Sequence, residues 1–332
     1  MLKLAFAISL TACFAHHHDE AALDAGDPAP TADAMTCGGQ KLDLTYVPPN
    51  FGIVLDRSCS MTQKLTGTQT TKWQAAVAAL DHALHVYATD VRWGLTMFPD
   101  TTGEACAQDP SQIAIDDGQA SAIRTLLHAS LDAADPNYPD GPCVTNIDTG
   151  VESAALDPAL ADPAHQSYLM LITDGAQSAG CDLGGGDPGT EKAVKDLFQL
   201  RHVPTFVVGF GSEADAAELT KLANKGGVPA QGATPYYQAD TAADLDAVFQ
   251  QIANQVVSCT YHVDQTPPDL DQTYVVYDHT TLVPRDPGHA MGWDYDAATT
   301  AITLYGTYCA ELKAHAVTTI DITFGCPSPP IL

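Results

Sequence analysis

Basic residues are scarce in this chain of 332 residues. It has 14 Lys and Arg against 41 Asp and Glu, which gives a formal net charge of −27 and an isoelectric point near 4.4. A surface of that sign repels polyphosphates and anionic headgroups. The composition therefore argues against nucleic-acid binding and against attachment to lipid through charge.

The chain also lacks long hydrophobic runs and paired-cysteine motifs. No stretch after the N-terminus approaches the roughly 18 apolar residues that predict a membrane-spanning helix. Nine cysteines are present without a CxxC pair, which argues against a zinc ribbon or a thioredoxin-like redox motif. Cysteines used in this way are typical of an exported, disulfide-bonded protein rather than a cytosolic one.

The N-terminus predicts export and lipidation. Residues 1–12 combine a basic Lys3 with an apolar segment too short to span a bilayer, which predicts a signal peptide. Leu-Thr-Ala-Cys then resembles the bacterial lipobox, so Cys13 is predicted to carry the lipid; cleavage after Ala15 by an ordinary signal peptidase is the alternative. Several acyl chains on one cysteine are enough for stable anchoring. We expect contact with the membrane through this anchor only.

The location of the anchored protein follows from the residues after the cysteine. Phe14 stands where Asp would indicate retention at the inner membrane, so the outer membrane is favoured. Residues 13–40 show no hydrophobic period and are rich in Ala, Asp and Pro, which predicts a flexible tether. The predicted product is a lipoprotein of the bacterial cell envelope.

Residues 41–258 alternate short apolar runs with helical patterns. The expected strands are 51–56, 91–99, 167–173 and 205–210. The expected helices are 72–89, 120–131, 147–156, 190–201, 213–224 and 242–257. Three of the strands are nearly continuous in apolar residues, as for parallel strands buried on both faces. The alternation predicts an α/β domain with a doubly wound, mostly parallel sheet, whose ligand site lies beyond the carboxyl ends of its central strands.

The pattern changes after Cys259. A polar, proline-bearing connector over 264–272 leads into segments of period-two β patterning, with one short helix expected around 309–314. The expected strands are 274–278, 280–284, 301–306 and 317–325. We expect residues 259–332 to form a small β-rich unit packed on the α/β domain.

Polar side chains follow two of the strands expected in the α/β domain. Asp56, Ser58 and Ser60 form a D-x-S-x-S element after the first strand, Asp174 follows the third, and Thr145 lies in a loop that enters a helix. Because the carboxyl ends of parallel strands meet at one edge of a sheet, these side chains are expected to converge. Carboxylates and hydroxyls are hard donors that suit Mg²⁺, Mn²⁺ or Ca²⁺ and disfavour zinc and copper.

These residues resemble the metal-ion-dependent adhesion site of a von Willebrand factor type A (vWA) domain. The resemblance implies that Ser58 and Ser60 ligate the metal directly and that Thr145 joins them in the ligand-bound state. It also implies that Asp56 and Asp174 act directly or through water. The likeness to the vWA fold covers residues 41–258, and the chain as a whole is similar to uncharacterised bacterial lipoproteins that carry this domain.

The resemblance implies a binding function. Where most direct ligands are neutral hydroxyls, the cation keeps positive charge and an open position, which an Asp or Glu of a protein or peptide partner can fill. We therefore expect adhesion or protein–protein recognition and no enzyme activity. Two alternatives are an envelope structural protein whose ion only stabilises the loops, and a metal-assisted hydrolase, for which the motifs supply no His or Glu as general base.

Eight cysteines remain for disulfides after Cys13 is assigned to the lipid: Cys37, Cys59, Cys106, Cys143, Cys181, Cys259, Cys309 and Cys326. Cys59 and Cys143 flank the expected metal loops, and a bridge between them would hold those loops together. Cys106 or Cys181 are equally reachable partners. The cysteines in and beside the tail are expected to join it to the α/β domain, but sequence alone leaves the connectivity open.

Overall fold

The computed structural model describes residues 40–41, 44–101, 106–141, 143–175, 177–178, 186–212, 214–314 and 316–325. The predicted signal peptide, the lipidation site and nearly all of the tether lie outside these residues, as do Cys37, Cys181 and Cys326. None of the helices in the described part of the chain combines the length and the apolar character needed to cross a membrane.

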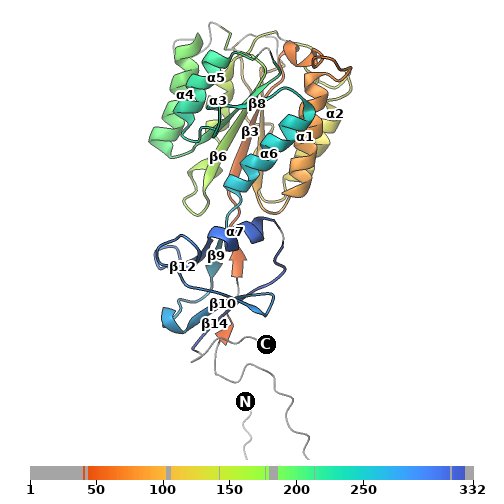
Figure 1. The fold of residues 1–332 in the computed structure, drawn as a ribbon. Coiled ribbons are helices and arrows are strands. Elements are labelled where there is room, and N and C mark those ends of the chain that lie inside the picture. Colours follow the sequence, from red (N-terminus) through yellow and green to blue (C-terminus); the bar gives the residue numbers. More distant parts are fainter. Residues whose placement is uncertain are drawn as a thin grey trace, which may run out of the picture.

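A six-stranded sheet forms the centre of the larger unit (Figure 1). In spatial order its strands are β5 (Ile113–Asp116), β4 (Arg92–Phe98), β3 (Asn50–Asp56), β6 (Ser167–Thr173), β7 (Thr205–Phe210) and β8 (Tyr237–Ala239). All neighbouring pairs are parallel except β4 and β5. The chain builds one half of the sheet outward from β3 and the other outward from β6, which confirms the doubly wound, mostly parallel sheet.

Helices cover both faces of this sheet. One face carries α1 (Lys72–Val86), α2 (Ala120–Ala129) and α6 (Ala242–Val256), and the other carries α3 (Ile147–Ala155), α4 (Gly186–Arg201) and α5 (Ala216–Gly226). Ile53 and Leu55 of β3 pack into the first layer, whereas Val54 packs into the second. A strand buried on both faces needs apolar side chains at successive positions, which explains the nearly continuous apolar run.

Several features of the sheet differ from the sequence-based expectation. The edge strands β5 and β8 were not predicted, because four and three residues are too few to show a period. Helix α5 begins at Ala216 rather than 213, because the side chain of Asp215 accepts the backbone amides of Ala217 and Glu218 and so fixes the first turn.

The smaller unit contains two four-stranded antiparallel sheets. One has the order β1 (Gln40–Lys41), β14 (Ile320–Phe324), β10 (Thr273–Tyr277) and β11 (Thr281–Val283). The other has the order β12 (Gly292–Asp296), β13 (Ala301–Tyr305), β9 (Thr260–Val263) and β2 (Leu44–Tyr46). Buried Trp293, Ile302 and Ile322 belong to the apolar cluster of this unit. Short 3₁₀ helices complete the described elements at η1 (Cys59–Thr62), η2 (Pro158–Ala161) and η3 (Leu270–Gln272).

The smaller unit also contains helix α7 (Gly306–Lys313), close to the short helix expected there. A disulfide joins Cys259, just before β9, to Cys309 in α7. These two cysteines therefore stabilise the tail internally, whereas we had expected them to join the tail to the α/β domain.

Both ends of the described chain contribute to the smaller unit. β1 pairs with β14, and β2 pairs with β9. Residues 40–41 and 44–46 therefore belong to the small sheets, although the sequence placed the start of the α/β domain at residue 41. Two linkers, 47–49 and 257–259, connect the units, which lie one above the other in Figure 1.

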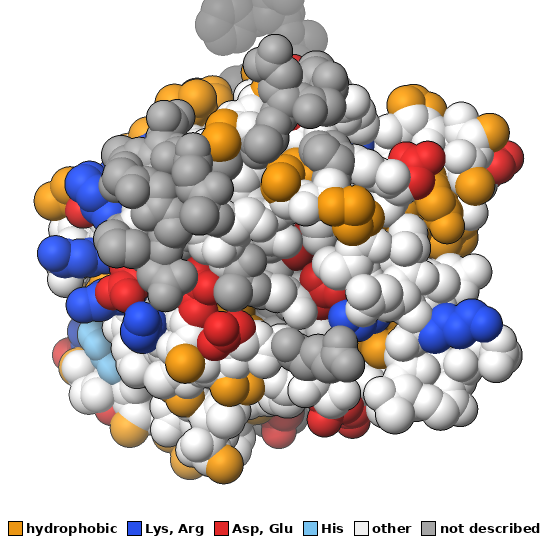
Figure 2. Space-filling view, turned by 90° about the horizontal axis from the view of Figure 1, so that it is seen from above, with side chains coloured by type: hydrophobic (Ala, Val, Ile, Leu, Met, Phe, Trp, Pro, Cys, Tyr) orange, Lys and Arg blue, Asp and Glu red, His pale blue; other side chains and the backbone are white. Residues whose placement is uncertain are grey.

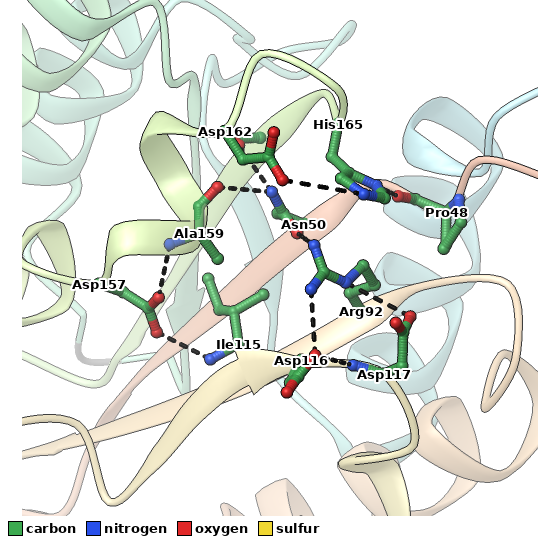
Figure 3. A network of polar contacts seen from close by, with 11 residues as sticks. Pro48, Asn50, Arg92, Ile115, Asp116, Asp117, Asp157, Ala159, Asp162 and His165 are labelled. Carbon is green, nitrogen blue, oxygen red and sulfur yellow. Dashed lines mark hydrogen bonds and ion pairs between the residues drawn. The ribbon is translucent and has the colours of Figure 1, made fainter. Parts of the chain in front are cut away.

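A buried polar network fixes the amino end of the central strands, where the linkers enter (Figure 3). Asn50 is fully buried; its Nδ2 donates to the carbonyl oxygen of Ala159 at 2.6 Å, and its Oδ1 accepts from Nη1 of Arg92 at 2.9 Å. In the same network, Nδ1 of His165 lies 2.6 Å from the carbonyl oxygen of Pro48 in the first linker. The network thus joins the linker to two strands and to the loop before β6.

Substitution of Asn50 tests the importance of this network. Asn50→Ala leaves the Ala159 carbonyl and the Arg92 guanidinium with one fewer partner in a buried setting, which should lower the free energy of unfolding by about 1–3 kcal/mol in a urea titration. The control is Asp117→Ala, which removes the ion pair between Oδ1 of Asp117 and Nε of Arg92, 3.3 Å apart. The Asp117 side chain is 75% exposed, so this substitution should change the free energy of unfolding by less than about 1 kcal/mol. Equal losses in the two variants would contradict this account.

Candidate metal centre

The D-x-S-x-S element lies at the carboxyl end of β3. Asp56 is the last residue of this strand, and the chain then turns into η1. Oδ1 of Asp56 accepts the backbone amide of Ser58 at 2.8 Å. The carboxylate thereby fixes the turn that presents both serines of the element. Asp56 and Ser58 are both buried.

Asp174 reaches the same point from the end of β6. Ser60 Oγ donates to Oδ1 of Asp174 at 2.7 Å, and the Oγ atoms of Ser58 and Ser60 are 2.9 Å apart. Thr173 Oγ1 donates to Oδ2 of Asp56 at 2.6 Å. Four of the five expected ligands therefore form one hydrogen-bonded cluster between β3 and β6, where the two halves of the sheet diverge. This is the position that doubly wound sheets use for ligands.

Thr145, the fifth expected ligand, lies beside this cluster. Its backbone amide donates to Ser178 Oγ at 2.9 Å, and the amide of Ser178 donates to its carbonyl oxygen at 2.7 Å. A Cβ atom placed on Gly175 would be 3.9 Å from Thr145 Oγ1. Within the described contacts, Thr145 thus joins the site through Gly175 and Ser178 rather than by a hydrogen bond to either carboxylate. Ser178 belongs to none of the motifs that predicted the other residues of this site.

A disulfide joins the two loops that carry the hydroxyl groups. Cys59 lies between Ser58 and Ser60, and Cys143 lies two residues before Thr145; their Cα atoms are 4.9 Å apart. Of the three partners that the sequence left open for Cys59, the structure selects Cys143. Cys106 is also disulfide-bonded.

The electrostatics of the cluster favour an added cation. Burial, and next to it the negative charge of Asp174, raise the pKa of Asp56 to about 7, against the lowering effect of the hydrogen bonds from Thr173 and Ser58. A buried carboxylate is unfavourable as an anion unless positive charge compensates it. A cation beside Asp56 would favour its ionised form.

The site contains a cationic side chain that the sequence analysis did not predict there. Lys72, the first residue of α1, donates from Nζ to Oδ2 of Asp174 at 2.7 Å. Both side chains of this ion pair are buried, with exposed fractions of 7% for Lys72 and 0% for Asp174. The sequence offered one signal: a basic residue in the first helical turn opposes the helix dipole.

Arg57 lies inside the D-x-S-x-S element but points to a neighbouring loop. Its Nε donates to the carbonyl oxygen of Pro99 at 2.8 Å, and its Nη1 donates to Oδ1 of Asn137 at 3.0 Å.

Figure 2 views the domain from above in the frame of Figure 1, onto the end of the sheet where this site lies. Acidic side chains are visible near the centre of that face, with a basic side chain beside them.

The donor set fits a hard divalent cation. Two carboxylates and three hydroxyls meet or adjoin at one point, and the ammonium of Lys72 on Asp174 shows that positive charge is accommodated there. No grouping of three or more His, Cys, Asp or Glu side chains suited to a metal occurs in the described ranges. Oxygen donors of this kind are typical of Mg²⁺, Mn²⁺ and Ca²⁺ sites.

Comparison with known proteins gives likenesses at the level of structure. No protein-family profile and no curated protein matches the chain. Proximal thread matrix protein 1 from the mussel byssus, with a zinc-occupied MIDAS motif, aligns with a TM-score of 0.45 and 14% identity over 65% of this chain and 49% of that one. The pilus adhesin SpaC from Lactobacillus rhamnosus GG aligns with a TM-score of 0.47 and 14% identity, over 86% of this chain and 39% of that one.

A von Willebrand factor type A structure from Catenulispora acidiphila aligns with a TM-score of 0.46 and 11% identity, over 83% of this chain and 57% of that one. This chain thus spans between 39% and 57% of the length of these three structures. The larger unit has a doubly wound, mostly parallel sheet with helices on both faces, and Asp56, Ser58, Ser60 and Asp174 lie at the carboxyl ends of its central strands, as the vWA resemblance implies.

Removal of the disulfide between the loops tests how the site is held. In the double variant Cys59→Ser/Cys143→Ser, amide hydrogen exchange at Ser60 and Thr145 should accelerate, because the two loops lose their covalent link. The double variant Cys259→Ser/Cys309→Ser removes a disulfide from the other unit and should leave both rates unchanged. Exchange at the metal loops that is equally fast in both variants would contradict a local role for the first disulfide.

Proposed function

We propose that the larger unit binds a divalent cation and uses it to recognise a carboxylate of a protein or peptide partner. The observation that carries this proposal is the cluster of Asp56, Ser58, Ser60 and Asp174, joined by hydrogen bonds where β3 and β6 diverge. A bound cation would supply an open coordination position for an oxygen of the partner. Mg²⁺ is the ion we favour, with Mn²⁺ or Ca²⁺ as alternatives.

Each residue of the cluster has a distinct part in this proposal. Ser58 and Ser60 offer neutral hydroxyl oxygens, and Thr145 would add a third from the facing loop. Asp56 and Asp174 supply the negative charge that retains the cation, directly or through water. Because the chain carries a formal net charge of −27, an acidic partner would be repelled without a cation at the contact.

A binding role is favoured over hydrolysis by the groups that touch the two carboxylates. In the described part of the chain, these are the hydroxyls of Thr173, Ser58 and Ser60, the backbone amide of Ser58 and the ammonium of Lys72. None of these neighbours is a general base at neutral pH, and in this proposal the two carboxylates themselves hold the cation, whereas hydrolysis needs a free base next to the reacting water. We therefore propose that the chain is not an enzyme.

Cation removal and a substitution at Asp56 test the proposed binding. Asp56→Asn removes charge but keeps the shape of the side chain, and should weaken Mn²⁺ binding at least tenfold in isothermal titration calorimetry. It should also abolish capture of cell-envelope proteins to the same extent as EDTA. The control, Asp246→Asn on helix α6, should behave like the unaltered chain in both measurements.

Two results of this experiment would decide against the proposal. Mn²⁺ affinity that is unchanged by Asp56→Asn would contradict the assignment of the metal centre. Capture that persists in EDTA while the melting temperature falls would contradict cation-dependent recognition, and would favour an ion that only stabilises the loops.

We also propose that the chain is anchored to the cell envelope through a lipid on Cys13, with the outer membrane favoured. The lipobox-like sequence supports this proposal, and so does the position of β1. This strand begins at Gln40 in the smaller unit, on the far side of that unit from the metal centre (Figure 1). An anchor on this side would leave the metal centre facing away from the membrane.

Metabolic labelling tests the anchor. When the full chain is expressed in a bacterium supplied with labelled palmitate, Cys13→Ala should abolish incorporation, because no other cysteine lies in a lipobox-like sequence. Cys37→Ala should leave incorporation unchanged. Normal export of an unlabelled native chain, with a mature N-terminus at residue 16, would instead support ordinary cleavage after Ala15.

A further inference from the structure

The two oxygens of Asp174 have different partners. Oδ1 accepts from Ser60 Oγ at 2.7 Å and so faces the serine cluster. Oδ2 accepts from Lys72 Nζ, also at 2.7 Å. One carboxylate therefore links the hydroxyl ligands on one side to a buried ammonium on the other. Lys72 lies beside the proposed ligands without occupying the place of any of them.

Helix α1 does not need a lysine at this position. Its first turn is capped by Thr71, whose Oγ1 accepts the amide of Gln74 at 3.1 Å, while the side chain of Gln74 accepts the amide of Thr71 at 3.0 Å. A positive charge at the amino end of a helix opposes the helix dipole, and burial of a charge is unfavourable unless it is paired. The ion pair with Asp174, and not helix stability, accounts for Lys72.

Gly211, at the end of a strand of the central sheet, lies against the side chain of Lys72. Gly211, directly after β7, has a φ of +93°, and a Cβ atom placed on it would lie 3.1 Å from Lys72 Cε. This glycine is itself fixed, because its amide donates to the carbonyl oxygen of Ala239 at 2.8 Å and its own carbonyl accepts from Gln238 Nε2 at 3.1 Å. The aliphatic part of the Lys72 side chain therefore runs from α1 past Gly211 at the end of β7.

The charges of the site identify what this arrangement does. Asp56, Asp174 and Lys72 together carry a formal charge of −1 when all three are ionised. A divalent cation would bring the site to +1, whereas the same site without the lysine would be neutral. We propose that Lys72 sets this excess of positive charge, so that the site binds its cation less tightly and binds a partner carboxylate more tightly.

This inference rests on the proposed function and makes it more specific. The ammonium of Lys72 next to Asp174 repels the divalent cation and reduces the attraction of the Asp174 carboxylate for that cation. The same ammonium adds to the attraction for an incoming carboxylate. The two affinities should therefore change in opposite directions when the charge is removed. A lysine that served only to stabilise the fold would change both in the same direction or neither.

Neutral variants of Lys72 test the inference in the full chain. Lys72→Met keeps the apolar stem, and Lys72→Gln keeps a hydrogen-bond donor for Asp174 should the first variant fold poorly. Calorimetric titration with MnCl₂ should give a dissociation constant at least fivefold lower in either variant than in the unaltered chain. Lys64→Met, an exposed lysine that changes the total charge equally, should leave the value within twofold.

Carboxylate binding is measured on the same proteins after saturation with Mn²⁺. Acetate is the probe, and its binding is followed by the loss of water-proton relaxation enhancement as it displaces water. The dissociation constant for acetate should be at least fivefold higher in Lys72→Met and Lys72→Gln. If the unaltered chain binds Mn²⁺ and both constants stay the same or move together, the role of Lys72 is wrong but the metal centre stands. If the unaltered chain does not bind Mn²⁺, the proposed function is wrong and the inference with it.

Discussion

Two carboxylates held close together and away from water are the constraint around which the metal centre is built. Asp56 is the last residue of β3 and Asp174 directly follows the parallel neighbour β6, so the sheet itself brings their charges together. Such a pair is unfavourable unless hydrogen bonds and positive charge surround it. Thr173, Ser58 and Ser60 provide the hydrogen bonds, and Lys72 provides one positive charge. The disulfide between the flanking loops holds this shell in place.

Sequence reasoning worked where a physical rule links neighbouring residues to a place in the fold. The apolar runs of β3 and β6 and the polar residues that follow them were enough to predict the sheet and the convergence of its strand ends. It did not work where the determining contact is remote. β2 has three residues and acquires its place by pairing with β9, more than two hundred positions away. Lys72 is unfavourable for the dipole of α1 at its position, and its burial depends on Asp174, which is 102 residues away in the sequence.

Strand β3 connects the two ends of the larger unit. Its first residue, Asn50, fixes the end that faces the smaller unit, and its last residue, Asp56, belongs to the metal centre. All seven of its residues are buried. A rigid strand with polar anchors at both ends keeps the metal loops at a constant orientation to the linkers. The position of the candidate metal centre therefore depends on contacts at the opposite end of the same strand.

The pairing of β1 and β2 with strands from the end of the chain makes the α/β domain an insertion within the smaller unit. Two linkers, 47–49 and 257–259, leave side by side instead of one. A pulling force between the α/β domain and the smaller unit would therefore divide between the two linkers. The force would then act on sheets whose strands come from both ends of the described chain, so that the smaller unit holds the two linkers together.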